Sequence, residues 1–330
     1  MTTPLSDGSF SHLKPDTVLA AVESQGHYCD ARIYPLNSYE NRVYQVGIED
    51  APALIAKFYR PARWRPEQIR EEHQWSLHLA QNQVPVVAPL VHAGESLFSY
   101  QGYYFALYPR SAGTPVALDD EDHLYALGQA LGQLHQQKSA LFTQRSTLNP
   151  QSDGGASRDF LLSSAFLPKT LKDDYQALSD KLLAAITERF SQVNYHLRPL
   201  HGDFHIGNVL WQNGPWLVDF DDAQNGPAVQ DMWMLLSGSV AAQQQQLAQV
   251  LEGYEEYCDF DTQELSLIPS LRALRLMNYS AWLARRWQDS AFPKAFPWFN
   301  GEGYWQAHLK QLSEALEDIK HTRYHRGQPL

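Results

Sequence analysis

Two neighbouring stretches carry the strongest chemical signal in the chain: His201-Gly202-Asp203-Phe204-His205-Ile206-Gly207-Asn208 and Leu217-Val218-Asp219-Phe220-Asp221-Asp222. Their side chains include the groups that transfer of a phosphoryl group requires. One carboxylate must orient an attacking hydroxyl and accept its proton, and Asp203 supplies it. An amide oxygen and a second carboxylate must hold Mg²⁺ against nucleotide phosphates, and Asn208 and Asp219 supply them. These hard oxygen ligands suit Mg²⁺ better than Zn²⁺.

The sequence around these stretches predicts an α+β fold with two lobes and a cleft between them. Residues 1–109 alternate β-rich runs with turns, which predicts a small lobe built on an antiparallel sheet. Residues 110–330 are dominated by helical periodicity, which predicts a larger, mainly helical lobe. Strands are expected over 31–36, 43–48, 54–59, near 90–92 and over 103–108. Helices are expected over 66–80, 124–135, 177–190, 242–257, 267–287 and 304–319.

Two further segments receive specific predictions. Asn213-Gly214-Pro215 separates two β-rich runs and predicts a strand–turn–strand unit over 209–211 and 216–220. Residues 147–158 are polar and contain a pair of glycines, so we expect a mobile loop there.

Composition limits the partners and the location of the protein. The 330 residues are 44% hydrophobic and have a formal net charge of −11, which argues against a general nucleic-acid or anionic-membrane binder. Cys29 and Cys258 are the two cysteines, far fewer than a secreted disulfide scaffold would use. Neither a signal peptide nor an apolar run of membrane-spanning length is visible. We therefore expect a cytoplasmic monomer.

The motifs resemble those of the aminoglycoside phosphotransferase and choline kinase family, whose members share the eukaryotic protein-kinase fold. The catalytic loop of that family, H-G-D-x-H-x-x-N, is matched at every position from His201 to Asn208. The metal-binding aspartate after an apolar strand is matched by Val218-Asp219. Gly226-Pro227-Ala228-Val229-Gln230-Asp231 and Leu127–His135 resemble two other family signatures. The resemblance implies an ATP- and Mg²⁺-dependent kinase, with the N-terminal lobe binding nucleotide and the C-terminal lobe holding catalytic and substrate sites.

The resemblance also assigns roles to residues of the N-terminal lobe. Lys57, on the third strand, is the lysine expected to contact the α- and β-phosphates. Its acidic partner on the following helix is Glu72, with Glu71 as the alternative. Ser38 lies in the turn expected to cover the phosphates, where it either contacts nucleotide or stabilises the turn. Asp231 is expected to support the catalytic loop by accepting backbone N–H groups.

A narrower resemblance is to a family of bacterial stress response kinases. It rests on 35–44, 226–233 and the aromatic and basic motifs within 285–298. It implies a cytoplasmic serine/threonine protein kinase whose substrate is another protein or the chain itself. Arg285, Arg286 and Lys294 are expected near the cleft, where they would favour an acidic peptide over a cationic alcohol.

Other interpretations have less support. A small-molecule alcohol kinase of the same fold stays open as the alternative. A phosphoesterase would need a second, histidine-rich ligand set, which the sequence lacks, and a nucleotide-binding pseudokinase would not need the complete set of catalytic groups. If Asp219 does not bind the metal, Asp221 is the next candidate ligand. A basic run of arginines is expected to be a solvated surface; it comprises Arg60, Arg63, Arg65 and Arg70.

Overall fold

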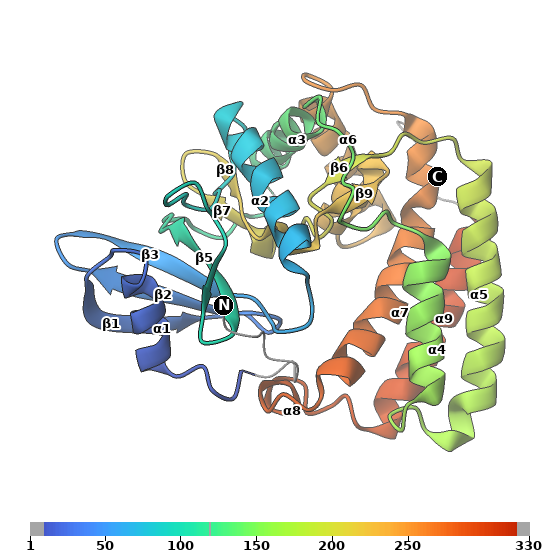
Figure 1. Ribbon diagram of the computed structural model, residues 1–330. Helices are drawn as coiled ribbons and strands as arrows, with labels where there is room; N and C mark the ends of the chain where they lie inside the picture. The colour runs from blue at the N-terminus through green and yellow to red at the C-terminus, as the bar shows by residue number, and fades with distance from the viewer. Residues whose placement is uncertain (1–9, 119, 322–330) are drawn as a thin grey trace.

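The computed structural model describes residues 10–118 and 120–321 and contains the two unequal parts that the sequence predicts (Figure 1). The smaller part is a five-stranded antiparallel sheet in the order β1-β2-β3-β5-β4. Its strands are β1 (Cys29–Leu36), β2 (Arg42–Ile48), β3 (Ala51–Phe58), β4 (Phe98–Tyr100) and β5 (Tyr103–Pro109). The larger part is mainly helical. The predicted α+β fold, with a small sheet and a larger helical body, is confirmed.

Two helices belong to the N-terminal third. The first, α1 (Pro15–Glu23), buries Val18, Ala21 and Val22 against the sheet. The second, α2 (Pro66–Gln81), connects β3 to the rest of the chain and matches the predicted helix closely. It begins at a proline, which suits the first helical turn because that turn needs no N–H donor from it.

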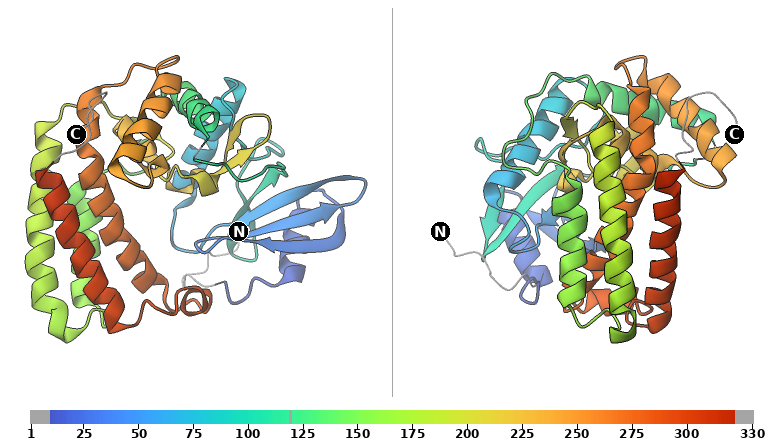
Figure 2. Two further views of the ribbon diagram at one scale, coloured as in Figure 1. Left: turned by 180° about the vertical axis from the view of Figure 1, so that it is seen from behind. Right: turned by 90° about the vertical axis from the view of Figure 1, so that its right-hand side faces the viewer.

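The helices of the C-terminal part form two groups (Figure 2). One is a bundle of α4, α5, α7 and α9, and the other is the pair of α3 and α6, which run in the same direction, with α3 in contact with the short strands at residues 198–200 and 215–217. Their bounds are α3 (Glu121–His135), α4 (Ala156–Ser163), α5 (Lys172–Gln192), α6 (Val240–Tyr254), α7 (Ile268–Arg286), α8 (Ala291–Ala295) and α9 (Glu302–Lys320). Within the described residues no helix is long and apolar enough to cross a membrane.

Two short antiparallel strand pairs lie in the segments between these helices. β6 (Arg198–Leu200) pairs with β9 (Gln224–Gly226), and β7 (Val209–Trp211) pairs with β8 (Pro215–Leu217). The chain therefore leaves β6, passes through residues 201–208, and returns beside them after β8. This return brings residues 201–208 and 217–222 together, as the strand–turn–strand prediction requires.

The contact between α3 and α6 depends on two glycines of α3, Gly128 and Gly132, which lie one turn apart. A Cβ atom on Gly128 would collide with the carbonyl of Val250, and one on Gly132 would press on the backbone of Tyr254. The backbones of the two helices therefore touch directly. This contact orients His135, at the end of α3, toward the site described below.

The side chains divide into two main hydrophobic cores. One lies under the sheet and includes Phe58, Phe105 and Leu107. The other fills the helical body and extends into the last turns of α2, where Trp75 and Leu79 belong to it. Ile69 of α2 packs instead in a third, smaller cluster with Tyr59, Leu97 and Ala106, so α2 contacts both the sheet and the helical body. The division of the chain after residue 109 stays a prediction.

Three local predictions were wrong. No strand forms at residues 90–92, and β4 at Phe98–Tyr100 pairs with β5 in its place. Residues 151–163 are helical, because Gly154 packs tightly against Leu183 and Leu274 of the bundle instead of facing solvent. The predicted strand over 216–220 ends at Leu217, since Asp219 has a left-handed backbone with φ of 62°.

Candidate active site

The loop that follows β6 is held in place by a buried aspartate. Asp231 accepts hydrogen bonds from the backbone N–H groups of His201 (2.7 Å) and Gly202 (2.8 Å). His135 lies 3.2 Å from the same carboxylate. A Cβ on Gly202, whose φ is +85°, would collide with the carbonyl of Asp222, so this position requires glycine. The predicted supporting role of Asp231 is confirmed.

Asp203 projects from this loop into the main cavity. Its Oδ1 accepts a hydrogen bond from Arg275 at 2.6 Å, and its Oδ2 lies 3.4 Å from Nε2 of His205. Burial by itself would raise the pKa of Asp203, but His205 and Arg275 outweigh it and hold that pKa well below its usual range. The carboxylate is therefore ionised at neutral pH, as a group that accepts a proton from a hydroxyl must be.

Asn208 and Asp219 lie together on the floor of the same cavity. The Asn208 side chain donates to the carbonyl of Asp203 at 2.9 Å, and the backbone N–H of Val218 donates to the carbonyl of Asn208 at 3.0 Å. The left-handed backbone of Asp219 turns its side chain into the cavity, where it is 49% exposed. Loop and hairpin thus place one amide and one carboxylate side by side.

This donor set fits Mg²⁺ shared with a ligand. Across residues 10–118 and 120–321, no group of three or more His, Cys, Asp or Glu side chains is arranged to enclose a metal ion. Mg²⁺ does not need such a cage, because it is commonly bound by one or two protein oxygens together with phosphates and water. The Mg²⁺ site at Asn208 and Asp219 stays a prediction that the geometry permits.

Lys57, on β3, contacts two carboxylates that line the cavity. Its Nζ lies 2.7 Å from Asp219 and 3.2 Å from Asp221, and its side chain is only 9% exposed. Burial would lower the pKa of Lys57, but the two carboxylates outweigh it and raise that pKa well above its usual value. The lysine is therefore charged and positioned beside the predicted metal ligand.

The adjacent glutamates of α2 have different surroundings. Glu71 accepts backbone N–H groups from Thr143, Gln144 and Arg145 at 2.6 to 2.8 Å. Glu72 is buried and lies in the electrostatic field of Lys57, which favours it over Glu71 as the acidic residue near the lysine. The ion pairs that Lys57 makes are nonetheless with Asp219 and Asp221 rather than with Glu72. Burial raises the pKa of Glu72 to about 7, against the opposing charge of Lys57.

The turn between β1 and β2 lines the cavity from the sheet side. Ser38 is half-buried there, so its predicted contact with nucleotide stays open. Asn41 donates to Asp221 at 3.1 Å, and Glu40 is paired with Arg286 of α7 at 2.7 Å and with the indole N–H of Trp282 at 2.6 Å. The turn is thus attached to the helical body.

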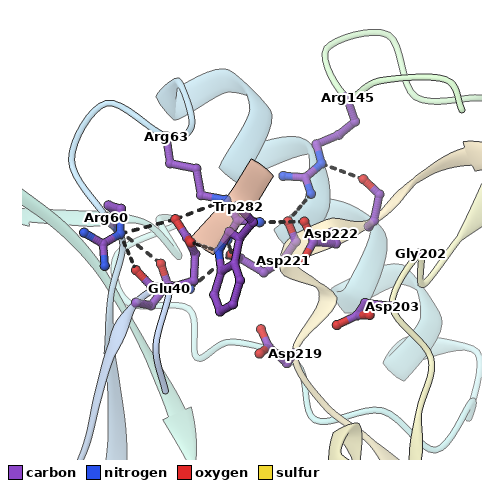
Figure 3. Close-up of polar contacts among 12 residues, drawn as sticks. Glu40, Arg60, Arg63, Arg145, Gly202, Asp203, Asp219, Asp221, Asp222 and Trp282 are labelled. Atoms are coloured by element: carbon purple, nitrogen blue, oxygen red, sulfur yellow. Dashed lines mark hydrogen bonds and ion pairs between the residues drawn. The ribbon is translucent and has the colours of Figure 1, made fainter. Parts of the chain in front are cut away.

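The sequence interpretation missed a network of charges behind this turn, which Figure 3 shows. Arg63 pairs with Asp221 and with Asp222, and Arg60 pairs with Glu40 and with Asp289. The prediction of a solvated basic surface was therefore wrong for Arg60 and Arg63. Arginines near acidic motif residues were a signal for such pairs, but the sequence does not show which carboxylates fold back onto them.

The predicted substrate-facing cations were also misplaced. Arg286 pairs with Glu40, and Arg285 points to the carbonyl of Ala156 and the ring of Phe160. Neither they nor Lys294 line the cavity, and Arg275 lies there instead. Arg275 is seven residues before Trp282 and thus on the same face of α7, but the sequence does not show that this face lines the cavity.

These side chains surround one cavity of about 550 Å³ between the sheet and the helical body. Its floor holds Asp203, Asn208 and Asp219, and one wall is formed by α7. The cavity thus joins a carboxylate base and oxygen ligands for a metal, and a charged lysine, Lys57, contacts one of these ligands. This arrangement suits transfer of a phosphoryl group.

Comparison with known proteins agrees with this class. Residues 32–268 match the model of the phosphotransferase enzyme family (APH), and the chain belongs to that family. Within it, the chain is 45% identical over 313 residues to stress response kinase A of Escherichia coli K12 and to the serine/threonine protein kinase RdoA of Salmonella typhimurium. Each alignment covers 94% of this chain and 94% of the relative. Both resemblances that the motifs suggested are confirmed.

Solved structures show the same fold at low sequence identity. An amicoumacin kinase in complex with AMP-PNP, Ca²⁺ and Ami has a TM-score of 0.72 at 17% identity, covering 97% of this chain and 98% of its own. A spectinomycin phosphotransferase in complex with ADP and spectinomycin has a TM-score of 0.65 at 15% identity, covering 90% and 97%. The prediction of a two-lobed kinase-like fold is therefore confirmed.

Proposed function

We propose that this phosphotransferase is an ATP- and Mg²⁺-dependent serine/threonine protein kinase that acts in the cytoplasm during stress response. The observation that carries the proposal is the 45% identity, over nearly the whole chain, to proteins named as stress response and serine/threonine protein kinases. The cavity supports it, because Asp203, Asn208 and Asp219 meet there and Lys57 contacts Asp219.

The nucleotide would lie on the side of the cavity where Lys57 contacts Asp219. AMP-PNP and ADP occur in the complexes of the two similar structures, which supports nucleotide binding here. Lys57 would leave Asp219 to contact the phosphates, and Asn208 and Asp219 would hold Mg²⁺. When bound, Mg²⁺ neutralises charge on the phosphate oxygens. Ser38 would face the phosphates from the turn above.

Asp203 would perform the proton transfer. It accepts the proton of the serine or threonine hydroxyl, whose oxygen forms the new bond to the γ-phosphorus. The bond between that phosphorus and the bridging oxygen breaks, and ADP leaves. The depressed pKa of Asp203 keeps the carboxylate ready to orient the hydroxyl over a wide pH range.

The proposal predicts that Asp203→Asn abolishes transfer while leaving nucleotide binding intact. The amide keeps the shape of the side chain but not its charge, so the single-turnover rate should fall ~10²–10⁴-fold. The measurement is incorporation of label from [γ-³²P]ATP into the acidic protein casein or into the chain itself, with phosphosites mapped by mass spectrometry. Removal of Mg²⁺ with EDTA should stop the reaction of the parent.

A different acceptor would overturn the proposed substrate class. Steady-state phosphorylation of choline, an aminoglycoside or another small alcohol, without protein phosphorylation above the Asp203→Asn control, would identify a small-molecule kinase. Transfer by Asp203→Asn within a few-fold of the parent would remove Asp203 from the proposed role.

A further inference from the structure

Arg275 occupies the position where an acceptor hydroxyl has to approach. Its guanidinium donates to Oδ1 of Asp203 at 2.6 Å, while His205 lies beside Oδ2. Both oxygens of the proposed base therefore already have partners. A carboxylate oxygen can accept a second hydrogen bond, but the guanidinium on Oδ1 stabilises the negative charge and so weakens Asp203 as a base, and moving Arg275 away strengthens it.

The helix α7 presents Arg275 to the cavity as part of a continuous wall. Leu271, Arg275, Tyr279 and Trp282 all line the cavity, and their spacing of three or four residues places them on one face of the helix. The wall runs from the proposed base toward the sheet side, where Trp282 contacts Glu40. An acceptor peptide lying along this wall passes Arg275 next to Asp203.

Arg275 differs from the other arginine that lines the cavity in the described part of the chain. Arg63 is largely buried and is paired with Asp221, Asp222 and Glu40. Arg275 is 47% exposed, and Asp203 is its one ion-pair partner among the described residues. The remaining N–H groups of Arg275 therefore face the cavity and are available to an anion.

The carboxylates of the cavity do not offer an equivalent site for a cation. Glu40, Asp221 and Asp222 are each paired with arginine, and Asp219 with Lys57. Asp153 accepts hydrogen bonds from the backbone of Asn149 at 2.9 Å and from Ser152 at 3.2 Å, which uses its carboxylate within its own turn. Of the two arginines that line the cavity in the described residues, Arg275 is the one exposed to an acceptor, at 47% against 16% for Arg63.

We propose that Arg275 selects acceptor peptides with a carboxylate next to the phosphorylated serine or threonine. The carboxylate of the peptide pairs with the guanidinium, as planar arginine does readily, and draws it away from Oδ1 of Asp203. Recognition of an acidic residue thereby frees the base for the neighbouring hydroxyl. The proposal rests on the proposed protein kinase function and names the class of segment that the same site takes.

The test compares peptides that differ only around one serine. One series places aspartates beside the serine, a second places alanines and a third places lysines, and kcat/KM is measured for each. The parent should prefer the acidic peptide over the alanine peptide about tenfold, the size expected of one charge-assisted hydrogen-bonded pair. Arg275→Gln should reduce this ratio to near one, and Arg275→Lys should keep part of it.

Arg285→Gln is the matched control, because Arg285 lies on the same helix but outside the cavity wall. It should keep the acidic preference of the parent. A merely structural role of Arg275 would lower all three rates together and leave the ratio unchanged, and that result would overturn the proposal. If Arg275→Gln does not fold, an unchanged ratio in Arg275→Lys would overturn it equally.

Failure of the proposed function gives a different result. If the parent phosphorylates no peptide and no protein but turns over a small alcohol, the protein kinase assignment itself is wrong. If the parent phosphorylates all three peptides equally, the kinase assignment holds and the selection by Arg275 is wrong.

Discussion

The two sides of the cavity neutralise their charges differently. On the Lys57 side, Lys57 and Asp221 are 9% and 5% exposed, and each is paired with more than one opposite charge. On the Asp203 side, Asp203 and Arg275 are 26% and 47% exposed and form a single direct ion pair. The buried side is built for a fixed arrangement, whereas the exposed side can exchange partners.

This difference matches what each side would have to do. A nucleotide has the same phosphates at every turnover, so its site gains from groups held in one geometry. An acceptor has to enter and leave, so its site gains from a pair whose separation costs little in water. The comparison predicts that substitutions on the Lys57 side affect stability as well as transfer, whereas those on the Asp203 side affect mainly transfer.

Asp221→Asn is expected to have the largest effect on stability. Asn keeps the volume but leaves Lys57 and Arg63 with one carboxylate less in a buried region. Loss of one partner from a buried ion pair typically lowers the free energy of unfolding by ~3–5 kcal/mol. Denaturation with urea measures it. Asp180→Asn is the control, because Asp180 is 52% exposed and pairs with Arg158 at the surface; its loss should stay within ~1 kcal/mol. Equal losses of stability in the two variants would contradict the proposed difference between buried and exposed ion pairs.

Glu71 and Glu72 should give opposite dependences of stability on pH. The pKa of Glu72 is raised to about 7 in the folded protein from an ordinary value of 4.5, so this group destabilises the fold as pH rises between those values. Glu72→Gln removes that term, and its stability relative to the parent should increase over this window by up to ~3 kcal/mol.

Glu71 is the matched comparison for Glu72. Hydrogen bonds from the backbone outweigh burial and lower the pKa of Glu71, so the stability that it adds is present above pH 4.5 and is lost as pH falls. Glu71→Gln should therefore lose stability relative to the parent as pH rises through that region. Urea denaturation at a series of pH values measures both, and slopes of the same sign would contradict the assignment.

The smallest effect on stability is expected on α7, where the adjacent Arg285 and Arg286 make different contacts. Arg286→Gln removes the ion pair with half-buried Glu40 and should lower the free energy of unfolding by ~1 kcal/mol. Arg285→Gln loses only a long hydrogen bond and a ring contact and should change it by less than ~0.5 kcal/mol. Urea denaturation measures both variants. A larger loss of stability for Arg285→Gln than for Arg286→Gln would show that Arg285 contributes more to holding α7 in place.

Much of the fold could be predicted because local patterns and packing agree. The helices over 66–80 and 124–135 are amphipathic, and the structure extends them by only a few residues. The prediction for 147–158 failed because its glycines indicate a loop locally, whereas in the fold Gly154 packs closely against α5 and α7. A single sequence does not distinguish these two uses of glycine.

The site could be predicted in part. Asp203, Asn208 and Asp219 share one short motif region, so their proximity followed from their spacing along the chain. Arg63 and Arg275 could not be assigned, because each meets its carboxylate only through the packing of distant elements. Composition shows that a cation is present, but only the fold shows which anion it faces.

The charge network behind the turn between β1 and β2 has a consequence for melting. Two separate hydrophobic cores would allow a chain to lose one part before the other. Here the pairs of Glu40 with Arg286 and of Asp289 with Arg60 cross from one core to the other. If either core unfolded, charged side chains of the other part that are little exposed would lose their ion-pair partners. The sheet and the helical body are thereby coupled into one cooperative unit, and heat should unfold them in a single calorimetric transition.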